Sequence, residues 1–204
     1  MTQREATALV AHAGFLVAVQ RDPLDLDRVW DGPTPTILEI GFGTGATTAA
    51  MAAAAPDTGI LAVDVHTPGV GDLLDLISAR ALTNVRVIEA DALAVLEFMI
   101  APAALAGVRS YFPDPWPKAR HHKRRLVQPD VLALVGSRLG AGGFWHLATD
   151  WQEYADAMVA CFVADPRWAG GVIDRPHDRP VTHYEARALR ERREITDLRF
   201  VWSP

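Results

Sequence analysis

The sequence is poor in cysteine and lacks long hydrophobic runs. Cys161 is the one cysteine among 204 residues, so the chain can form no internal disulfide and has no Cys-x-x-Cys pair for zinc or redox chemistry. The longest apolar stretch near the start, residues 8–19, is too short to span a bilayer, and it lacks a clear small-residue cleavage site. We therefore expect a protein of a reducing compartment, the cytoplasm, with no membrane contact.

Internal repeats, low-complexity tracts and serine-rich linkers are also missing. A length of 204 residues suits one domain, and 50% of the residues are hydrophobic, which is enough for an ordinary core. The net charge of −5 would normally argue against a nucleic-acid partner. It does not exclude one, because phosphate binding depends on where the positive charges lie.

Short apolar runs alternate with longer segments rich in alanine and leucine. Runs of this kind are typical of strands that are covered on both faces, so the pattern predicts a doubly wound α/β fold with a mostly parallel sheet. The predicted strands span residues 36–40, 59–63, 85–88, 108–112 and 144–147, and the predicted helices span residues 46–55, 71–81, 92–99 and 129–139.

The pattern changes after Asp150. Residues 151–164 predict one more helix, and residues 167–180, rich in Gly, Pro, Asp and Arg, predict a loop. The alternation over residues 197–202 predicts a final strand, which would form an antiparallel edge if it pairs with residues 144–147. The buried stripe expected on the helix consists of Tyr154, Met158, Cys161 and Phe162.

A glycine-rich turn, Glu39-Ile40-Gly41-Phe42-Gly43-Thr44-Gly45, follows the first predicted strand. Gly41, Gly43 and Gly45 let the backbone turn tightly and bring a ligand close to a helix N-terminus. Gly41, Gly43 and Ala46 also satisfy the dinucleotide pattern in its Gly-or-Ala form, so an NAD-dependent oxidoreductase stays open. An acid at Glu39 would repel a pyrophosphate but suits a ligand with ammonium and sulfonium charges, and S-adenosylmethionine is such a ligand.

Two further acids follow the next two predicted strands. Asp64 can accept hydrogen bonds from both hydroxyls of a ribose, in nucleotide and adenosylmethionine folds alike. Asp91 can accept a hydrogen bond from the adenine amino group, and it can also cap the helix that begins at Ala92. An acid after each of the three strands favours S-adenosylmethionine over NAD.

The fourth predicted strand runs into Phe112-Pro113-Asp114-Pro115-Trp116-Pro117-Lys118. Three prolines fix the backbone around one carboxylate and one indole ring. A planar base can stack on the ring of Trp116 while Asp114 binds its N–H edge. The alternative is a proline-rich turn whose Trp fills the core and whose Asp caps the next element.

A basic run follows at once, with no acid among residues 118–125. This concentration in an acidic chain predicts a site for a polyanion, next to the expected cofactor site. The adjacent pair His121-His122 lacks the spacing of helical metal ligands, so we expect no metal. The permanent cations of the run are Lys118, Arg120, Lys123, Arg124 and Arg125.

Taken together, these motifs resemble those of the bacterial tRNA (guanine-N7-)-methyltransferases. The resemblance covers about residues 36–202, and the block FPDPWPKARHHKRRLVQP, residues 112–129, is its most specific part. His146-Leu147-Ala148-Thr149-Asp150-Trp151 and Thr182-His183-Tyr184-Glu185, similar to a Thr-x-x-Glu signature, also match. The chain departs from the family at Asp64, where Glu is usual, at Pro117, where His is frequent, and in its short, weakly basic N-terminal segment.

The resemblance implies a class I methyltransferase fold, Rossmann-like, with an antiparallel edge strand. It also implies methylation of guanine N7 at position 46 of the tRNA variable loop, without a metal. A single domain over residues 1–204 would comprise a helical lead-in (1–35), a cofactor-binding core (36–150) and a C-terminal part (151–204) that contacts substrate.

The resemblance further implies the role of each site residue. Asp114 matches the proposed catalytic residue. The matching cofactor-binding acids are Glu39, Asp64, Asp91 and Asp114; the substrate-contacting positions are Lys118, Asp150, Thr182, His183, Tyr184 and Glu185; and the RNA-contacting stretch is Arg120, His121, His122, Lys123, Arg124 and Arg125.

Three alternatives stay open. Asp150 can cap the helix that begins at Trp151, and Glu185 can be a surface acid that faces Arg187 or Arg190. The whole chain can also be an RNA-binding scaffold that has a methyltransferase fold without activity.

Overall fold

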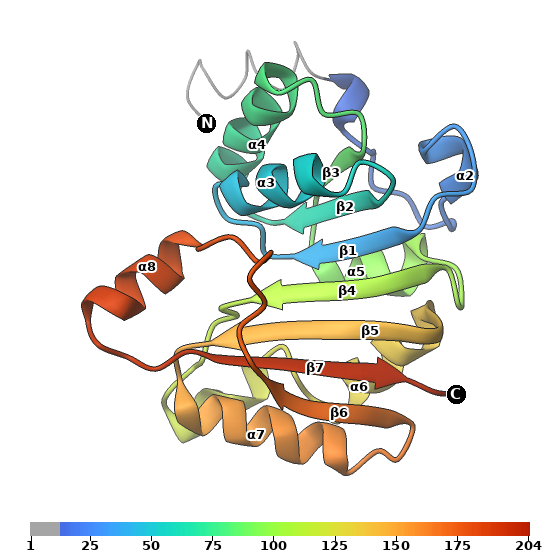
Figure 1. Ribbon diagram of the computed structural model, residues 1–204. Coiled ribbons are helices and arrows are strands. Elements are labelled where there is room, and N and C mark those ends of the chain that lie inside the picture. The colour runs from blue at the N-terminus through green and yellow to red at the C-terminus, as the bar shows by residue number, and fades with distance from the viewer. Residues whose placement is uncertain (1–12) are drawn as a thin grey trace.

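Seven strands form one sheet in the order β3-β2-β1-β4-β5-β7-β6 (Figure 1). The computed structural model describes residues 13–204. Strands β1 to β5 run parallel, β7 is antiparallel to β5, and β6 is antiparallel to β7. The strands are β1 (Thr36–Ile40), β2 (Gly59–Asp64), β3 (Val85–Glu89), β4 (Leu105–Tyr111), β5 (Leu139–Thr149), β6 (Trp168–Ile173) and β7 (Thr196–Trp202).

Helices cover both faces of the sheet, because the parallel strands are connected by crossovers. The helices are α2 (Leu26–Val29), α3 (Ala46–Ala54), α4 (Thr67–Ala79), α5 (Ala92–Ala94), α6 (Pro129–Arg138), α7 (Gln152–Val163) and α8 (His183–Arg190). Short helical turns are η1 (Ala13–Phe15), η2 (Val95–Met99) and η3 (Ala119–Arg124). This is the doubly wound α/β fold that the alternating pattern predicts.

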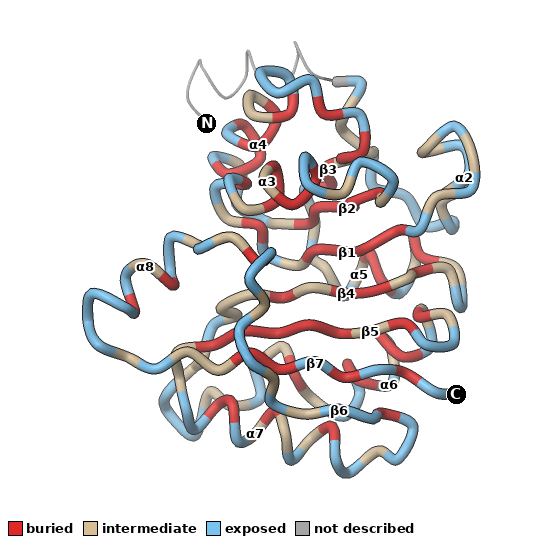
Figure 2. Tube along the Cα trace, viewed as in Figure 1, coloured by how far each residue is buried: buried red, intermediate tan, exposed pale blue. Residues whose placement is uncertain are grey.

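Two apolar cores lie on opposite faces of the sheet, and successive residues of β2 show why. Ile60 and Ala62 pack with α3 and α4, whereas Leu61 and Val63 pack with η2, α6 and α7. All four are buried, so both faces of this strand are covered (Figure 2). Helix α8 lies outside both cores and is largely exposed in the same view.

The last strand confirms the predicted antiparallel edge. Residues 144–149 of β5 pair with residues 196–201 of β7, with Trp145 opposite Phe200. On α7, Tyr154, Met158 and Phe162 are buried as predicted, whereas Cys161 is half-buried.

The prediction of a loop over residues 167–180 is wrong in its first half, where β6 forms the other edge of the sheet. Its two glycines weaken a strand signal, but the close approach of β7 requires one of them, since a Cβ on Gly170 would lie 2.1 Å from the Arg199 carbonyl oxygen. Trp168 anchors the strand by packing against the rings of Phe162 and Trp202. These partners are distant in sequence, so local composition did not show them.

The predicted helical lead-in falls partly outside the described residues. From residue 13 to residue 35 helix is confined to η1 and α2, and Leu16 forms an isolated bridge with Val87. Across the described part of the chain, every helix is too short or too polar to cross a membrane.

Candidate active site at the carboxyl edge of the sheet

The ends of β1, β2 and β4 meet at one edge of the sheet because these strands are parallel. Between β1 and α3, Gly41 and Gly43 adopt φ values of 78° and 60°. Side chains at both positions would be strained by these angles, yet a Cβ there would meet only open space. The turn therefore forms a backbone cradle that a ligand can approach closely.

Asp64 holds this turn in place from the end of β2. Its Oδ2 accepts a hydrogen bond from the Gly43 N–H at 3.0 Å, and its Oδ1 accepts one from the His66 N–H at 3.1 Å. The carboxylate thus ties the glycine turn to the start of α4.

Glu39 carries a buried carboxyl group beside the same turn. Only 3% of the residue is exposed, and its Oε2 has no hydrogen-bond partner within residues 13–204. Burial raises the pKa of Glu39 to about 7, against the opposing effects of Thr48 and Arg109. An unpartnered buried carboxylate oxygen is rare in proteins and indicates a site for a donor from a ligand.

Two cavities flank the end of β1. A cavity of about 140 Å³ is lined by Glu39, the glycine turn, Tyr111 and the residues Thr182, His183 and Tyr184. A second cavity, of about 490 Å³, includes Ile40, the residue after Glu39. Its polar and aromatic lining includes Asp91, Asp114, Trp116, Lys123 and Arg124.

Another cavity, of about 590 Å³, lies at the opposite edge of the sheet. Its lining includes Thr34, Asp57 and Asn84, which precede β1, β2 and β3. Ligands of open parallel sheets bind beyond the carboxyl ends of the strands, so we place the active site at the two cavities beside β1.

The proline-rich segment connects β4 to η3, with Asp114 exposed near its centre. Phe112 and Trp116 both have positive φ, 53° and 43°, which is costly for bulky residues. The Phe112 ring stacks on Tyr184 at 6.5 Å, and the Arg124 guanidinium lies 4.9 Å from the Trp116 ring centroid. A strained backbone held at both ends is typical of functional sites, and here it presents a carboxylate.

The basic run is not uniform. Lys118, Arg120, Lys123 and Arg124 are exposed, whereas Arg125 is buried. Arg125 donates to the Pro115 carbonyl at 2.9 Å and forms a bidentate pair with Glu153. Arg120 donates to the His121 ring at 3.3 Å and Arg124 lies over Trp116, but both remain exposed and can still reach phosphates. The guanidinium of Arg125, in contrast, is buried against its protein partners.

His121 and His122 also differ in their surroundings. His121 packs edge-on against Trp116 with ring centroids 5.8 Å apart. The His122 carbonyl accepts a hydrogen bond from Gln128, and the His122 Nε2 is buried without a partner among the described residues. No cluster of His, Cys, Asp and Glu that could hold a metal ion is found between residues 13 and 204.

Three acids illustrate how the alternatives resolve. Asp91 caps α5 by accepting from the amides of Leu93 and Ala94, as the cap prediction expects. Asp150 pairs with Arg193 at 2.8 Å, so the prediction that it caps α7 is wrong.

Glu185 is buried, so the prediction of a surface acid facing Arg187 or Arg190 is wrong as well. Its partners are Arg175 and Arg179, which contact its two oxygens at 2.6 Å each. Thr182 caps α8 by accepting from the Glu185 N–H.

Comparisons with known proteins agree with this geometry. A family described as "Putative methyltransferase" matches residues 33–198. Proteins named tRNA (guanine-N(7)-)-methyltransferase from Streptomyces coelicolor and Burkholderia cenocepacia are both 50% identical to the chain. The alignments span 185 and 189 residues, 88% and 91% of this chain and 68% and 74% of the relatives. The chain belongs to the tRNA (guanine-N(7)-)-methyltransferase family.

Solved structures support the fold of this family member. The 16S rRNA methyltransferase KamB superposes with a TM-score of 0.65 at 15% identity, over 92% of this chain and 97% of that one. The antibiotic-resistance methyltransferase Kmr gives a TM-score of 0.62 at 17% identity, over 92% of this chain and 95% of that one. At these identities the likeness shows a shared class I methyltransferase fold and nothing finer.

The residues at the glycine turn of the methyltransferase fit S-adenosylmethionine. The unpartnered Oε2 of Glu39 can accept from an ammonium group, and the open cradle at Gly41 and Gly43 leaves room for a ligand. Gly45, with φ of 73°, begins α3 and packs against Leu73, which seats the helix N-terminus behind the cradle.

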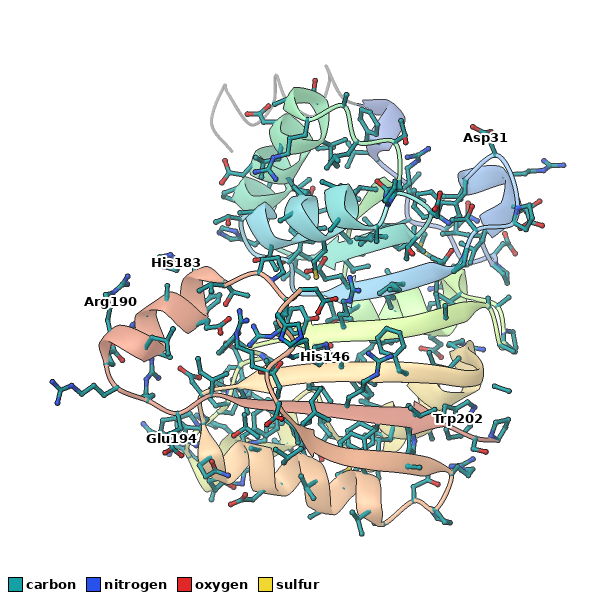
Figure 3. The ribbon with its side chains drawn as sticks, in the orientation of Figure 1. Asp31, His146, His183, Arg190, Glu194 and Trp202 are labelled. Carbon is teal, nitrogen blue, oxygen red and sulfur yellow. The ribbon has the colours of Figure 1, made fainter. Side chains whose placement is uncertain are left out.

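Sequence reasoning missed two features of this methyltransferase. One is a hydrogen-bonded network that includes Tyr111, His146, Arg179 and Asp197. Its members lie on separate segments of the chain, so no local sequence pattern predicts it. The other is a group of exposed arginines on and after α8, of which Arg190 projects away from the sheet (Figure 3). The four arginines of residues 187–193 were the available signal.

Proposed function

We propose that this chain transfers the methyl group of S-adenosylmethionine to N7 of a guanine in tRNA, at position 46 of the variable loop, in the cytoplasm. The observation that carries the proposal is that consecutive residues at the end of β1, Glu39 and Ile40, line the two cavities. The acid-lined glycine turn at Glu39 borders one cavity, and Asp114 with the free cations borders the next. Cofactor and RNA base can therefore meet at the end of one strand.

The cofactor-binding residues are those of the turn and the neighbouring strand ends. Glu39 binds the ammonium group, Asp64 faces the ribose hydroxyls, and Asp91 accepts from the adenine amino group. Asp91 uses Oδ1 for both capping bonds, so capping and ligand binding are compatible. Gly41, Gly43 and Gly45 allow the close approach.

When bound, S-adenosylmethionine supplies a methyl group on a positively charged sulfur. Guanine N7 has an available lone pair and no proton, so no residue of the chain must act as a strong base. The N7–carbon bond forms as the carbon–sulfur bond breaks, and alignment of the three atoms contributes up to about 7–11 kcal/mol.

Asp114 is the catalytic candidate in this scheme. Positive charge develops on guanine as N7 is methylated, and a carboxylate beside the base stabilises that charge. The same carboxylate can bind the N–H edge of the base and hold N7 in line.

The RNA backbone is bound next to this site. Lys123 and Arg124 line the cavity that contains Asp114, Lys118 and Arg120 are exposed in the same basic run, and all four contact phosphates. Asp150, Thr182, His183 and Tyr184 hold the base or its ribose from the other side.

The direct test is transfer of labelled methyl from S-adenosylmethionine to an unmodified tRNA transcript. The matched control transcript carries 7-deazaguanosine in the variable loop and lacks the acceptor nitrogen. Label on the first transcript alone is the expected result. Equal labelling of both would contradict N7 of that guanine as the acceptor, and no label with the cofactor bound would contradict tRNA methylation.

A further inference from the structure

Helix α8 carries the residues that border the cofactor cavity, yet it is attached to the protein with little apolar packing. Only Glu185 and Ala188 of the helix are buried, while Tyr184 and Leu189 are each 56% exposed. A short helix with so small an apolar contact cannot be held in one position by hydrophobic burial. Polar contacts must set the position of α8.

Those contacts converge on Arg179, whose side chain is 1% exposed. Its guanidinium lies 2.6 Å from Oε2 of Glu185 on α8 and 2.8 Å from Oδ1 of Asp197 on β7. The same guanidinium lies 5.4 Å from the ring centroid of Tyr111 at the end of β4. One side chain therefore joins α8, β7 and Tyr111, which lines the cofactor cavity.

The network continues from Asp197 to the cavity. His146 Nε2 lies 3.0 Å from Asp197 Oδ1, and His146 Nδ1 lies 3.0 Å from the Tyr111 hydroxyl. Since a carboxylate only accepts, Nε2 donates to Asp197, and Nδ1 faces the Tyr111 hydroxyl on the other side of the ring. Figure 3 shows His146 at the centre of the sheet, between β4 and β7. Tyr111 lines the same cavity as Thr182 and Tyr184.

The network is balanced in charge. Arg175 and Arg179 face the carboxylates of Glu185 and Asp197, and Arg175 also donates to the Arg179 carbonyl at 2.7 Å. Although burial acts in the opposite direction, hydrogen bonds from the two arginines hold the pKa of Glu185 below its ordinary value. Buried ion pairs contribute little net stability, but their fixed geometry can specify one arrangement of the elements they join.

Glu185 has no oxygen left to offer to a base. Oε1 faces Arg175 at 2.6 Å and Arg179 at 3.2 Å, and Oε2 faces Arg179 at 2.6 Å. The side chain is 1% exposed. Contact with guanine would require breaking a buried bidentate pair, which is strongly unfavourable.

We propose that Arg179 is a positioning residue that fixes Thr182 and Tyr184 over the cofactor cavity, and that Glu185 acts through Arg179 without touching guanine. The part that concerns catalysis rests on the proposed function. Tyr184 also stacks on Phe112, two residues before Asp114, so a displaced α8 alters both cavities.

The test is a double-mutant cycle of Arg179→Lys and Glu185→Gln, read by the rate of methyl transfer at saturating substrates. We expect each single variant to lower this rate at least about tenfold, with tRNA affinity unchanged, because the exposed cations are untouched. The double variant should fall no further than the more affected single variant. Multiplied effects would show that Glu185 acts independently of Arg179 and would overturn the inference.

Amide hydrogen exchange supplies a readout that does not depend on tRNA methylation. Arg179→Lys should speed exchange at residues 183–190 at least about tenfold while β1 and β4 keep their protection. Unchanged exchange in α8 would overturn the inference, even if the wild-type protein methylates tRNA. Faster exchange without any methylation by the wild type would remove the proposed function and leave the positioning role intact.

Two further variants control for folding. Arg167→Lys alters an exposed pair with Asp165 beside β6 and should change neither readout. If Arg179→Lys fails to fold, the same cycle with Asp197→Asn decides the question, because Asp197 holds the other side of the Arg179 guanidinium at 2.8 Å. Loss of methyl transfer in Glu185→Gln that persists in full in the Asp197→Asn background would contradict the proposal.

Discussion

Gly69, in the first turn of α4, packs so closely on Gly43 that a Cβ at residue 69 would lie 2.0 Å from the Gly43 carbonyl oxygen. Real Cβ atoms do not approach an oxygen to this distance, so the cofactor turn and α4 would have to move apart. The shape of the turn thus depends on a glycine that lies outside the glycine-rich motif.

We expect Gly69→Ala to weaken binding of S-adenosylmethionine at least about tenfold, or about 1.4 kcal/mol. Gly171→Ala is the matched control, because a Cβ there meets nothing within 4 Å. Calorimetric titration of both variants measures the difference. Equal affinities would show that the turn tolerates the displacement.

Glu39 should make the protein less stable as the pH rises. Burial raises the pKa of the folded-state carboxyl from 4.5 to about 7, so the unfolded chain ionises first. The contribution to stability is fully present below about pH 4.5 and is lost as the pH rises to about 7, by about 3 kcal/mol at most.

Glu39→Gln removes this pH dependence. The free energy of unfolding of the variant should therefore rise relative to that of the wild type between about pH 5 and about pH 7, and the difference should stay constant at higher pH. Urea unfolding across this range gives the two stability curves. Parallel curves would contradict a raised pKa. The same variant should lose cofactor binding, since the acceptor for the ammonium group becomes neutral.

Asp114→Asn should lower the rate of methyl transfer about a hundredfold while tRNA still binds. The reason is that the amide cannot stabilise positive charge on the methylated base. Single-turnover transfer and filter binding separate the two effects. Asp130→Asn, an acid of the same cavity wall on α6, is the control and should leave transfer within about twofold.

The exposed cations of η3 should contribute to the salt dependence of tRNA binding. Lys123→Ala should lower the slope of log affinity against log salt by about 1, which corresponds to one lost phosphate contact. Arg80→Ala, an exposed cation at the end of α4, should leave the slope unchanged. A normal slope for Lys123→Ala would remove this residue from the RNA interface.

Arg125 should behave differently from its neighbours in the basic run. Arg125→Ala removes the bonds to Pro115 and Glu153 and the contact with the Tyr154 ring, so we expect a loss of about 1–3 kcal/mol in the free energy of unfolding. Arg124→Ala, at an exposed position, should change it by less than about 0.5 kcal/mol. Thermal unfolding of both variants checks the contrast.

Much of the site could be predicted from the sequence because its parts are local. Glycines in one turn, acids at strand ends and a basic run beside a proline-rich segment each occupy a few consecutive residues. Parallel strands place their carboxyl ends at one edge, so the periodicity alone predicts that these parts lie together. The wrong loop over residues 168–173 and the wrong alternatives for Asp150 and Glu185 share a cause, because each depends on partners far along the chain.

Local sequence was therefore sufficient for the mostly parallel sheet, the cofactor turn and the family. Three-dimensional packing was needed to decide which charged side chains are exposed and which are paired with other groups of the protein. Arg124 and Arg125 are neighbours of identical chemistry, yet one lies exposed over Trp116 and the other is buried against Tyr154. Arg179 and Arg190 show the same contrast, because Arg179 is buried in an ion pair with Glu185 whereas Arg190 is exposed. Ionic contacts depend on distances of a few ångströms between separate segments, and such distances exist only once the sheet has brought the segments together.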